Sequence, residues 1–232
     1  MYLLALETST EYCSCALSAA GEVRELCVQA GHTHSERLLP MVTQLMAEAG
    51  IGYGQLDAIA FGAGPGSFTG LRIACGAAQG LAFAHDLPVV AVSTLEALAA
   101  DTDADRVLAC QDARMGELYL AAYERAGAVW RGIFAPALLR TDGLPVLDGR
   151  WVGVGSGFAA HAAALARYDL AATMPERFPR ARAIAALALV KAARGETVPA
   201  EAAAPFYLRD KVALDKAEQA ALRAANRAGV AA

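Results

Sequence analysis

The chain has 232 residues, a net charge of −4 at pH 7 and a mean hydropathy of +0.34. This length is enough to bury a core in one large domain or in two smaller lobes, and the 56% of hydrophobic residues excludes a disordered protein. The acidic balance lacks the basic footprint that a protein binding nucleic acid by itself usually shows. The sequence has no apolar run of membrane-spanning length and no basic leader, so we expect no membrane contact and no signal peptide.

The cysteines bear on the cellular compartment. The five cysteines are odd in number and include no CxxC pair. We therefore expect reduced, mostly buried thiols and a cytoplasmic protein. A zinc site would require more ligands close to them than the sequence places there.

The first hundred residues alternate between short apolar runs and amphipathic segments. Apolar side chains at helical spacing predict a helix over 36–49, with Pro40 in its early turns and Gly50 at its end. Three apolar runs separated by polar turns predict a meander of strands at 3–6, 13–17 and 23–28. The other predicted elements are a strand at 56–61, a glycine-rich loop at 62–72, a helix at 67–85, a strand at 88–92 and a helix at 94–100.

The acidic stretch 101–105 predicts a boundary, and the elements after it repeat the first pattern. The predicted elements are strands at 107–111, 117–123, 129–134 and 151–154, a second glycine turn at 153–157, and helices at 158–167, 181–194 and 211–227. The predicted domains are therefore 1–100 and 101–209, while 210–232 forms a tail helix that packs on one lobe or the other.

Two lobes that each open with a meander of three strands resemble the actin-like, sugar-kinase and Hsp70 superfamily, a two-lobe fold related to ribonuclease H. The expected fold class is accordingly α/β, with a mixed sheet and flanking helices in each lobe. In that fold two glycine-rich turns face each other across a cleft and hold a nucleotide. The turns at 62–72 and 153–157 are the matching features of this chain.

Several sequence motifs narrow the resemblance to one family. They are LALETST at 4–10, GAGPGSFTGLRI at 62–73, QDARMGELYLAAY at 111–123, GVGSG at 153–157 and PFYLR at 205–209. In order and spacing these motifs resemble those of the bacterial TsaB (YeaZ) family. The resemblance covers almost the whole chain up to Arg209.

The resemblance implies a subunit rather than an enzyme. TsaB-like proteins pair with a longer paralogue, TsaD, and act with TsaE. Together they transfer a threonylcarbamoyl group to the adenosine beside the anticodon of tRNAs that read codons beginning with A. TsaD carries the catalysis. We therefore expect this chain to meet tRNA only through the complex, and to form a homodimer when TsaD is absent.

The glycine-rich loop is the first candidate site. A strand, a glycine turn and a helix start together present N–H groups that suit a phosphate. The candidates for such an anion loop are Glu7, Thr8, Ser9, Gly64, Gly66, Ser67, Thr69, Gly70, Gly155 and Gly157. The loop lacks the lysine of GxxxxGK[ST], and Ser67 occupies the last glycine position of GxGxxG. The alternative is a tight turn for close packing, with Ser67 or Thr69 capping the helix. We predict a degenerate site without a cofactor.

The metal ligands of catalytic relatives are missing. The resemblance places a His-x-x-x-His pair of TsaD-like proteins at Thr94 and Leu98, and neither side chain replaces an imidazole. Glu7 stands where kinases of this fold have an aspartate that helps to hold the cation and phosphates. We therefore predict no catalytic residue and no metal site of that type.

Two other groups of polar residues have more than one interpretation. His32 and His34, with a glutamate nearby, are a conceivable metal site, although a place in solvent or at an interface is simpler. Asp112 and Glu117 flank a tight turn and suit a cleft site, although pairing with the arginine of the turn is simpler. The alternative function is a free-standing small ATPase or a protease-like hydrolase of the same fold.

The partner face is predicted on the helices at 36–49 and 67–85, which are apolar over more than one side. Small or adaptable side chains suit contacts between helices. The candidates are Met41, Leu45, Met46, Leu71, Cys75 and Ala78. The alternative is that these side chains form the core of the first lobe.

Overall fold

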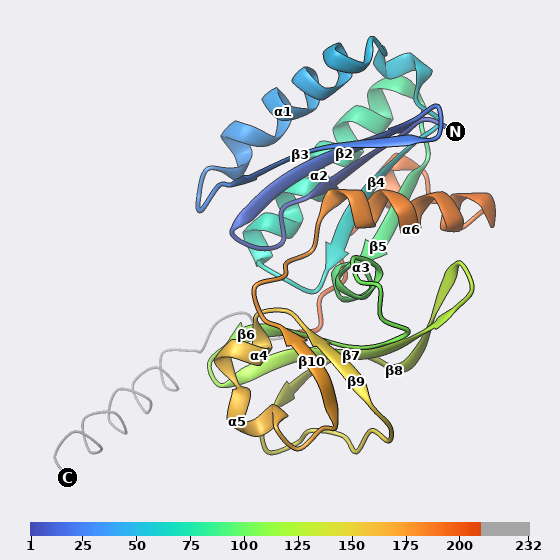
Figure 1. Ribbon diagram of the computed structural model, residues 1–232. Helices are drawn as coiled ribbons and strands as arrows, with labels where there is room; N and C mark the ends of the chain where they lie inside the picture. The colour runs from blue at the N-terminus through green and yellow to red at the C-terminus, as the bar shows by residue number, and fades with distance from the viewer. Residues whose placement is uncertain (210–232) are drawn as a thin grey trace, which may run out of the picture.

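The computed structural model describes residues 1–209, which form two mixed five-stranded sheets (Figure 1). The first half contains β1 (Leu3–Glu7), β2 (Tyr12–Ala19), β3 (Glu22–Gln29), α1 (His34–Ala49), η1 (Tyr53–Gln55), β4 (Ala58–Gly64), α2 (Phe68–His85), β5 (Val89–Ser93) and α3 (Thr94–Ala100). The second half contains β6 (Arg106–Arg114), β7 (Glu117–Ala126), β8 (Val129–Arg140), β9 (Trp151–Val154), α4 (Gly157–Ala160), α5 (Ala162–Leu165), β10 (Leu170–Met174), α6 (Ala181–Ala193) and η2 (Ala200–Ala202). The tail helix expected at 211–227 lies outside the described residues.

The first sheet has the order β3-β2-β1-β4-β5. Its first three strands form an antiparallel meander, and β4 and β5 extend it in parallel. Leu4 and Leu6 of β1 face α1 and α2, while Leu3 and Ala5 face α6. Because helices cover both faces, all five residues of β1 are buried. None of the described helices is long and apolar enough to cross a membrane.

α6 lies in the first lobe although it comes late in the chain (Figure 1). Ile184 packs in the core on the first sheet, Arg180 pairs with Glu25 of β3, and Arg182 pairs with Asp101 at 2.6 Å. The segment 101–209 was expected to form the second lobe, so α6 departs from that division. Helical periodicity predicts that such a helix exists, but it does not say which sheet the helix covers.

The second sheet has the order β10-β9-β6-β7-β8 and repeats the topology of the first. β6, β7 and β8 form an antiparallel meander, and β9 and β10 run parallel to their neighbours. The α/β fold with two lobes, each opened by a meander, is thereby confirmed.

Three elements of the second lobe differ from the prediction. β10 was missed, because its alanine-rich segment lies largely exposed at the edge of the sheet and shows no apolar alternation. The helix expected at 158–167 is divided into α4 and α5, since His161 between them has non-helical backbone angles. β8 continues to Arg140, beyond the predicted end at 134.

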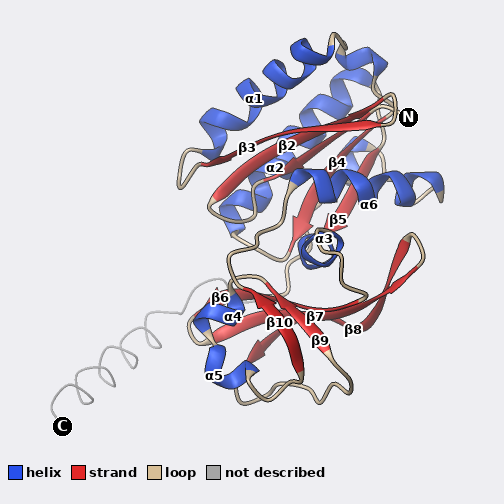
Figure 2. Ribbon diagram, viewed as in Figure 1, coloured by secondary structure: helices blue, strands red, loops and turns tan. Residues whose placement is uncertain are grey.

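α3 lies between the two sheets (Figure 2). Its Leu95 and Leu98 pack into the core on the second sheet, and its Ala97 packs beneath α6 in the first lobe. The hydroxyl of Ser93 accepts a hydrogen bond from the Glu96 N–H and caps the helix start. α3 is therefore one of the covalent links between the lobes, and it also packs between them.

Candidate functional site

The turn after β1 and the glycine loop before α2 are interlocked. The Ser67 N–H donates to the Ser9 carbonyl oxygen at 2.8 Å, and the Thr8 hydroxyl donates to the Gly70 carbonyl oxygen at 2.7 Å. A Cβ on Gly70 would lie 1.9 Å from the Thr8 carbonyl oxygen, and one on Gly66 would lie 2.6 Å from the Ser9 Cβ. These glycines are thus required by close contacts between two segments of the chain itself.

The start of α2 uses its own N–H groups. Ser67 is the N-cap, and its hydroxyl accepts from the Gly70 N–H at 3.4 Å, while Thr69 is exposed. Gly64 has φ +125°, and a Cβ there would lie 2.7 Å from the Phe206 carbonyl oxygen. The N–H groups of Ser67 and Gly70 therefore serve internal contacts rather than an open anion cradle.

Glu7 is buried where β1 ends. Its side chain accepts a hydrogen bond from the Ser9 N–H, and its second carboxylate oxygen has no partner within residues 1–209. A Cβ on Gly62 would lie 1.7 Å from that oxygen, so the glycine makes room for the carboxyl group. Burial raises the pKa of Glu7 from 4.5 to about 7, and hydrogen bonds from Ser9 and Thr8 offset this only in part. The Glu7 carboxyl group therefore occupies the space beside Gly62, and near pH 7 it is only partly ionised.

The second glycine turn packs in the same way. A Cβ on Gly155 would lie 2.4 Å from the Cys110 carbonyl oxygen, and one on Gly157 would lie 2.2 Å from the Cys110 Sγ. The turn also holds β6 through Ser156, whose hydroxyl accepts from the Asp112 N–H at 3.1 Å. Both turns therefore close on the strand that opens their own lobe.

α3 contacts both glycine turns. At its start the Thr94 hydroxyl donates to the Pro65 carbonyl oxygen in the first turn. One turn of helix later, Leu98 lies 3.1 Å from the place of a Cβ on Gly155 in the second. The positions predicted for the missing histidine pair, Thr94 and Leu98, thus bridge the two turns by packing.

The histidines and acidic residues weighed from the sequence lie apart. His32 is exposed, whereas His34 is buried and its Nε2 lies 3.2 Å from the Tyr12 carbonyl oxygen. Asp112 Oδ1 lies 3.1 Å from His161 Nε2, a contact that the sequence did not suggest. Within residues 1–209 no three His, Cys, Asp or Glu side chains are grouped so that they could hold a metal ion.

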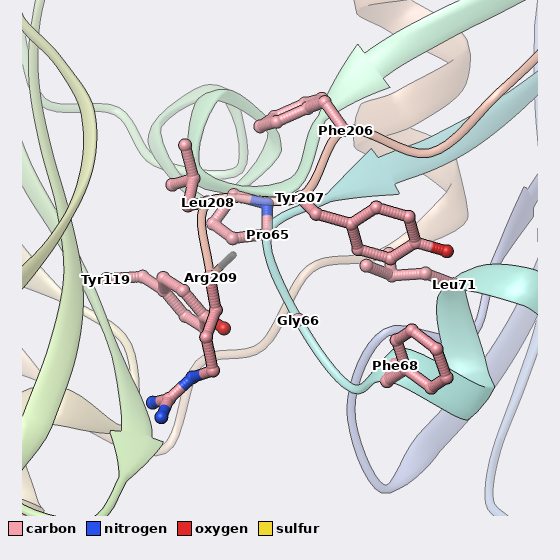
Figure 3. A pocket seen from close by; sticks show the side chains of 9 residues that line it. All are labelled: Pro65, Gly66, Phe68, Leu71, Tyr119, Phe206, Tyr207, Leu208 and Arg209. Atoms are coloured by element: carbon pink, nitrogen blue, oxygen red, sulfur yellow. The ribbon is translucent and has the colours of Figure 1, made fainter. Parts of the chain in front are cut away.

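A small pocket opens beside the first glycine turn (Figure 3). It is lined by Pro65, Gly66, Phe68, Leu71, Tyr119, Phe206, Tyr207, Leu208 and Arg209. The Phe68 ring lies 5.5 Å from the Tyr207 ring, and the Arg72 guanidinium stacks 3.7 Å from the Phe68 centroid. One wall is formed by residues of the PFYLR motif at 205–209, for which the sequence predicted no role in a site. Its mixture of aromatic and basic residues was the available signal.

The six side chains predicted for the partner face are all buried in the first lobe. They are Met41, Leu45, Met46, Leu71, Cys75 and Ala78. Five of them join the core between the first sheet and the helices α1 and α2, which corrects the expectation that they form an exposed face. The outer side of α2 instead carries Arg72, Gly76, Gly80 and Phe83, and the Phe83 side chain is 77% exposed.

Two lobes with matching sheet topology and a glycine turn after a central strand of each define an actin-like α/β protein. A family model described as "TsaD: tRNA N6-adenosine threonylcarbamoyltransferase" matches residues 28–227. The protein of Escherichia coli (strain K12) named tRNA threonylcarbamoyladenosine biosynthesis protein TsaB is 40% identical over an alignment of 229 residues that covers 93% of this chain and 98% of that protein.

Solved structures agree with these relatives. The structure of YeaZ from Pseudomonas aeruginosa matches with a TM-score of 0.83 and 42% identity, covering 89% of this chain and 99% of that one. A structure described as an uncharacterized protein with similarity to peptidase YeaZ from Pseudomonas aeruginosa matches with a TM-score of 0.84 and 42% identity, covering 90% and 99%. The chain belongs to the TsaB (YeaZ) family.

Proposed function

We propose that this protein is a non-catalytic subunit that acts with TsaD and TsaE in the cytoplasm to modify tRNA. The complex would transfer a threonylcarbamoyl group to the adenosine beside the anticodon in tRNAs that read codons beginning with A. The observation that carries the proposal is the 40% identity to the Escherichia coli protein named for tRNA threonylcarbamoyladenosine biosynthesis, over 93% of this chain. With a net charge of −4, the chain is expected to meet tRNA only through the complex.

The two glycine turns support a subunit role over the alternative of a free-standing ATPase or hydrolase. Gly66 and Gly70 are occupied by close contacts with the turn after β1, and Gly157 by contact with Cys110. The Glu7 carboxyl, with its pKa raised to about 7, is a weaker cation ligand near neutral pH than an ionised aspartate. These features favour a chain that holds its actin-like shape without turning over a nucleotide.

Reconstitution tests the proposal. Purified TsaD, TsaE, tRNA and a threonylcarbamoyl donor are mixed with and without this chain, and modified adenosine is measured by mass spectrometry of the digested tRNA. We expect product only when the chain is present, and none from the chain alone. The proposal fails if the chain by itself turns over ATP at a rate that Ser67→Ala abolishes, or if the modification proceeds equally well without it.

The partner surface is proposed on the outer side of α2. Gly76 and Gly80 lie one helical turn apart, and a Cβ on either would meet no atom within 4 Å, so a second helix can approach closely there. Phe83 and, on α1, Leu39 are large apolar side chains that are 77% and 48% exposed. We propose that this surface binds TsaD, and that it binds a second copy of the chain when TsaD is absent.

Gly80→Glu is expected to weaken binding to TsaD and to a second copy of the chain without destabilising the fold. Glutamate has a higher helix propensity than glycine, so the free energy of unfolding should rise by up to about 1 kcal/mol. A carboxylate buried in the contact costs several kcal/mol, so affinity for TsaD should fall at least about a hundredfold and the homodimer should become a monomer. Chemical denaturation, light scattering and titration calorimetry measure the three effects.

The matched control for this variant is Ala186→Glu, an exposed helical position of α6 on the opposite face of the first sheet. Its binding and mass should equal those of the unchanged protein. The proposed surface is wrong if Gly80→Glu leaves both the homodimer and TsaD binding intact.

A further inference from the structure

The segment after η2 crosses from the first lobe to the second. After η2, which contacts α2, it passes Pro65 and Gly66 of the first glycine turn and reaches Tyr119 of β7 (Figure 3). Residues 203–209 are called the cross-lobe segment below. Its contacts with each lobe are made by particular side chains and backbone groups.

The cross-lobe segment is fastened to the first lobe by its backbone. The Ala203 carbonyl oxygen accepts from Gln79 Nε2 at 2.8 Å, and the Phe206 N–H donates to the Ala63 carbonyl oxygen at 3.0 Å. The Phe206 carbonyl oxygen lies 2.7 Å from the place of a Cβ on Gly64, an approach that only glycine allows. The first glycine turn thus also binds the cross-lobe segment.

The Tyr207 side chain of the cross-lobe segment also contacts the start of α2. Arg72 Nε donates to the Tyr207 hydroxyl at 3.1 Å, and the Tyr207 ring lies against the Phe68 ring at 5.5 Å. The Arg72 guanidinium covers the Phe68 ring from 3.7 Å. These contacts hold the segment over the helix start that the actin-like fold elsewhere offers to a nucleotide.

The far end is fastened to the second lobe by Leu208 and Arg209. Leu208 packs against the core on the second sheet. Arg209 Nη2 lies 2.8 Å from a carboxylate oxygen of Glu117 and donates to the Ala113 carbonyl oxygen at 2.8 Å. The side chains of Arg209 and Glu117 are only 18% and 25% exposed, so this ion pair is partly shielded from solvent.

We propose that the cross-lobe segment is a clasp that fixes the angle between the lobes in place of a bound nucleotide. α3 and the connection between β10 and α6 join the two lobes, and lobes joined by a limited contact move relative to each other by default. The clasp adds a further contact between the lobes, from β4 and α2 to the hairpin of β6 and β7. The lobe angle is then a property of the chain itself.

The test measures the distance between the lobes in the full chain. Spin labels are placed at Ala47→Cys on α1 and Ala163→Cys on α5, both exposed, with the half-buried Cys27 changed to serine and the other cysteines left buried. The labelled protein with an unchanged cross-lobe segment should give one narrow distance distribution that millimolar Mg-ATP does not shift. Arg209→Ala should broaden the distribution and speed amide exchange at residues 112–117 by about tenfold, as expected for losing a hydrogen bond to a charged group.

Two companion variants keep the result interpretable. Arg150→Ala removes an exposed arginine that pairs with Asp169 within the second lobe, and it should leave the distribution narrow. Arg209→Glu combined with Glu117→Arg restores an ion pair across the lobes and should recover a narrow distribution. If Arg209→Ala does not fold, Glu117→Gln, which keeps the side-chain shape, takes its place in the same measurement. The proposal is overturned if Arg209→Ala, or Glu117→Gln in its place, leaves the distance distribution equally narrow and the amide exchange unchanged. It is also overturned if Mg-ATP shifts the distance distribution of the protein with an unchanged cross-lobe segment.

Discussion

Gly70→Ala should destabilise the protein by about 3 kcal/mol or more, a large effect for a single methyl group. The new Cβ would lie 1.9 Å from the Thr8 carbonyl oxygen, and backbone atoms cannot move aside as a flexible side chain can. The hydrogen bond from the Thr8 hydroxyl to the Gly70 carbonyl oxygen would be disturbed by the same displacement. Urea unfolding followed by circular dichroism measures the change.

The same helix supplies the control. Gly76 also lies in α2, but a Cβ there meets no atom within 4 Å. Gly76→Ala should therefore raise the free energy of unfolding by about 0.5–1 kcal/mol, the ordinary gain from replacing an exposed helical glycine. If the two variants have equal stability, Gly70 is not kept for close packing on the turn after β1, and the anion-loop interpretation regains support.

Glu7→Gln should make stability less dependent on pH, and it should be the more stable form in alkaline buffer. The folded pKa of about 7 exceeds the unfolded value of 4.5, so the folded protein holds the proton more tightly. Below pH 4.5 the Glu7 carboxyl is neutral in both the folded and the unfolded state, so it does not lower the free energy of unfolding. As pH rises from 4.5 to 7, the unfolded state ionises first and stability falls. Above pH 7 the loss is complete, at about 3 kcal/mol.

Glutamine has the same shape and no charge, so it avoids this loss. Relative to the unchanged protein, its free energy of unfolding should therefore gain about 2–3 kcal/mol between pH 4.5 and pH 8. Denaturant unfolding at several pH values measures the gain. The exposed Glu176→Gln is the matched control for removing one carboxylate. Parallel stability profiles of Glu7→Gln and the unchanged protein would show that burial does not hold the proton on Glu7.

Local patterns accounted for most of the elements in the first lobe. The run Leu3–Glu7 alternates its side chains between two covered faces, and the helical spacing around Leu38 and Leu45 gives α1 its buried side. Predictions failed where the signal is weak along the chain. The exposed, alanine-rich β10 has neither alternation nor bulk, and the break falls at His161, whose ring contacts Asp112 of a distant strand.

The candidate site shows the same division. The missing lysine of the glycine loop and the unusual Glu7 were visible in the sequence, and both pointed to a degenerate nucleotide site. The contacts that occupy the loop were not visible, because Thr8, Ser9 and Phe206 reach it from positions far apart in the chain. The partner-face candidates were misplaced for a related reason, since apolar periodicity marks the buried side of a helix rather than the side left for a partner.

The sequence by itself determined the two lobes, their strand meanders, the two glycine turns and the family, because each depends on short-range periodicity or on backbone conformations that few residues other than glycine can adopt. Only the tertiary structure decided that α6 covers the first sheet, that the glycines make room for Thr8 and Ser9, and that Arg209 ties the lobes together. These three features depend on contacts between segments that are far apart in the chain. Such contacts leave no periodic pattern in a single sequence.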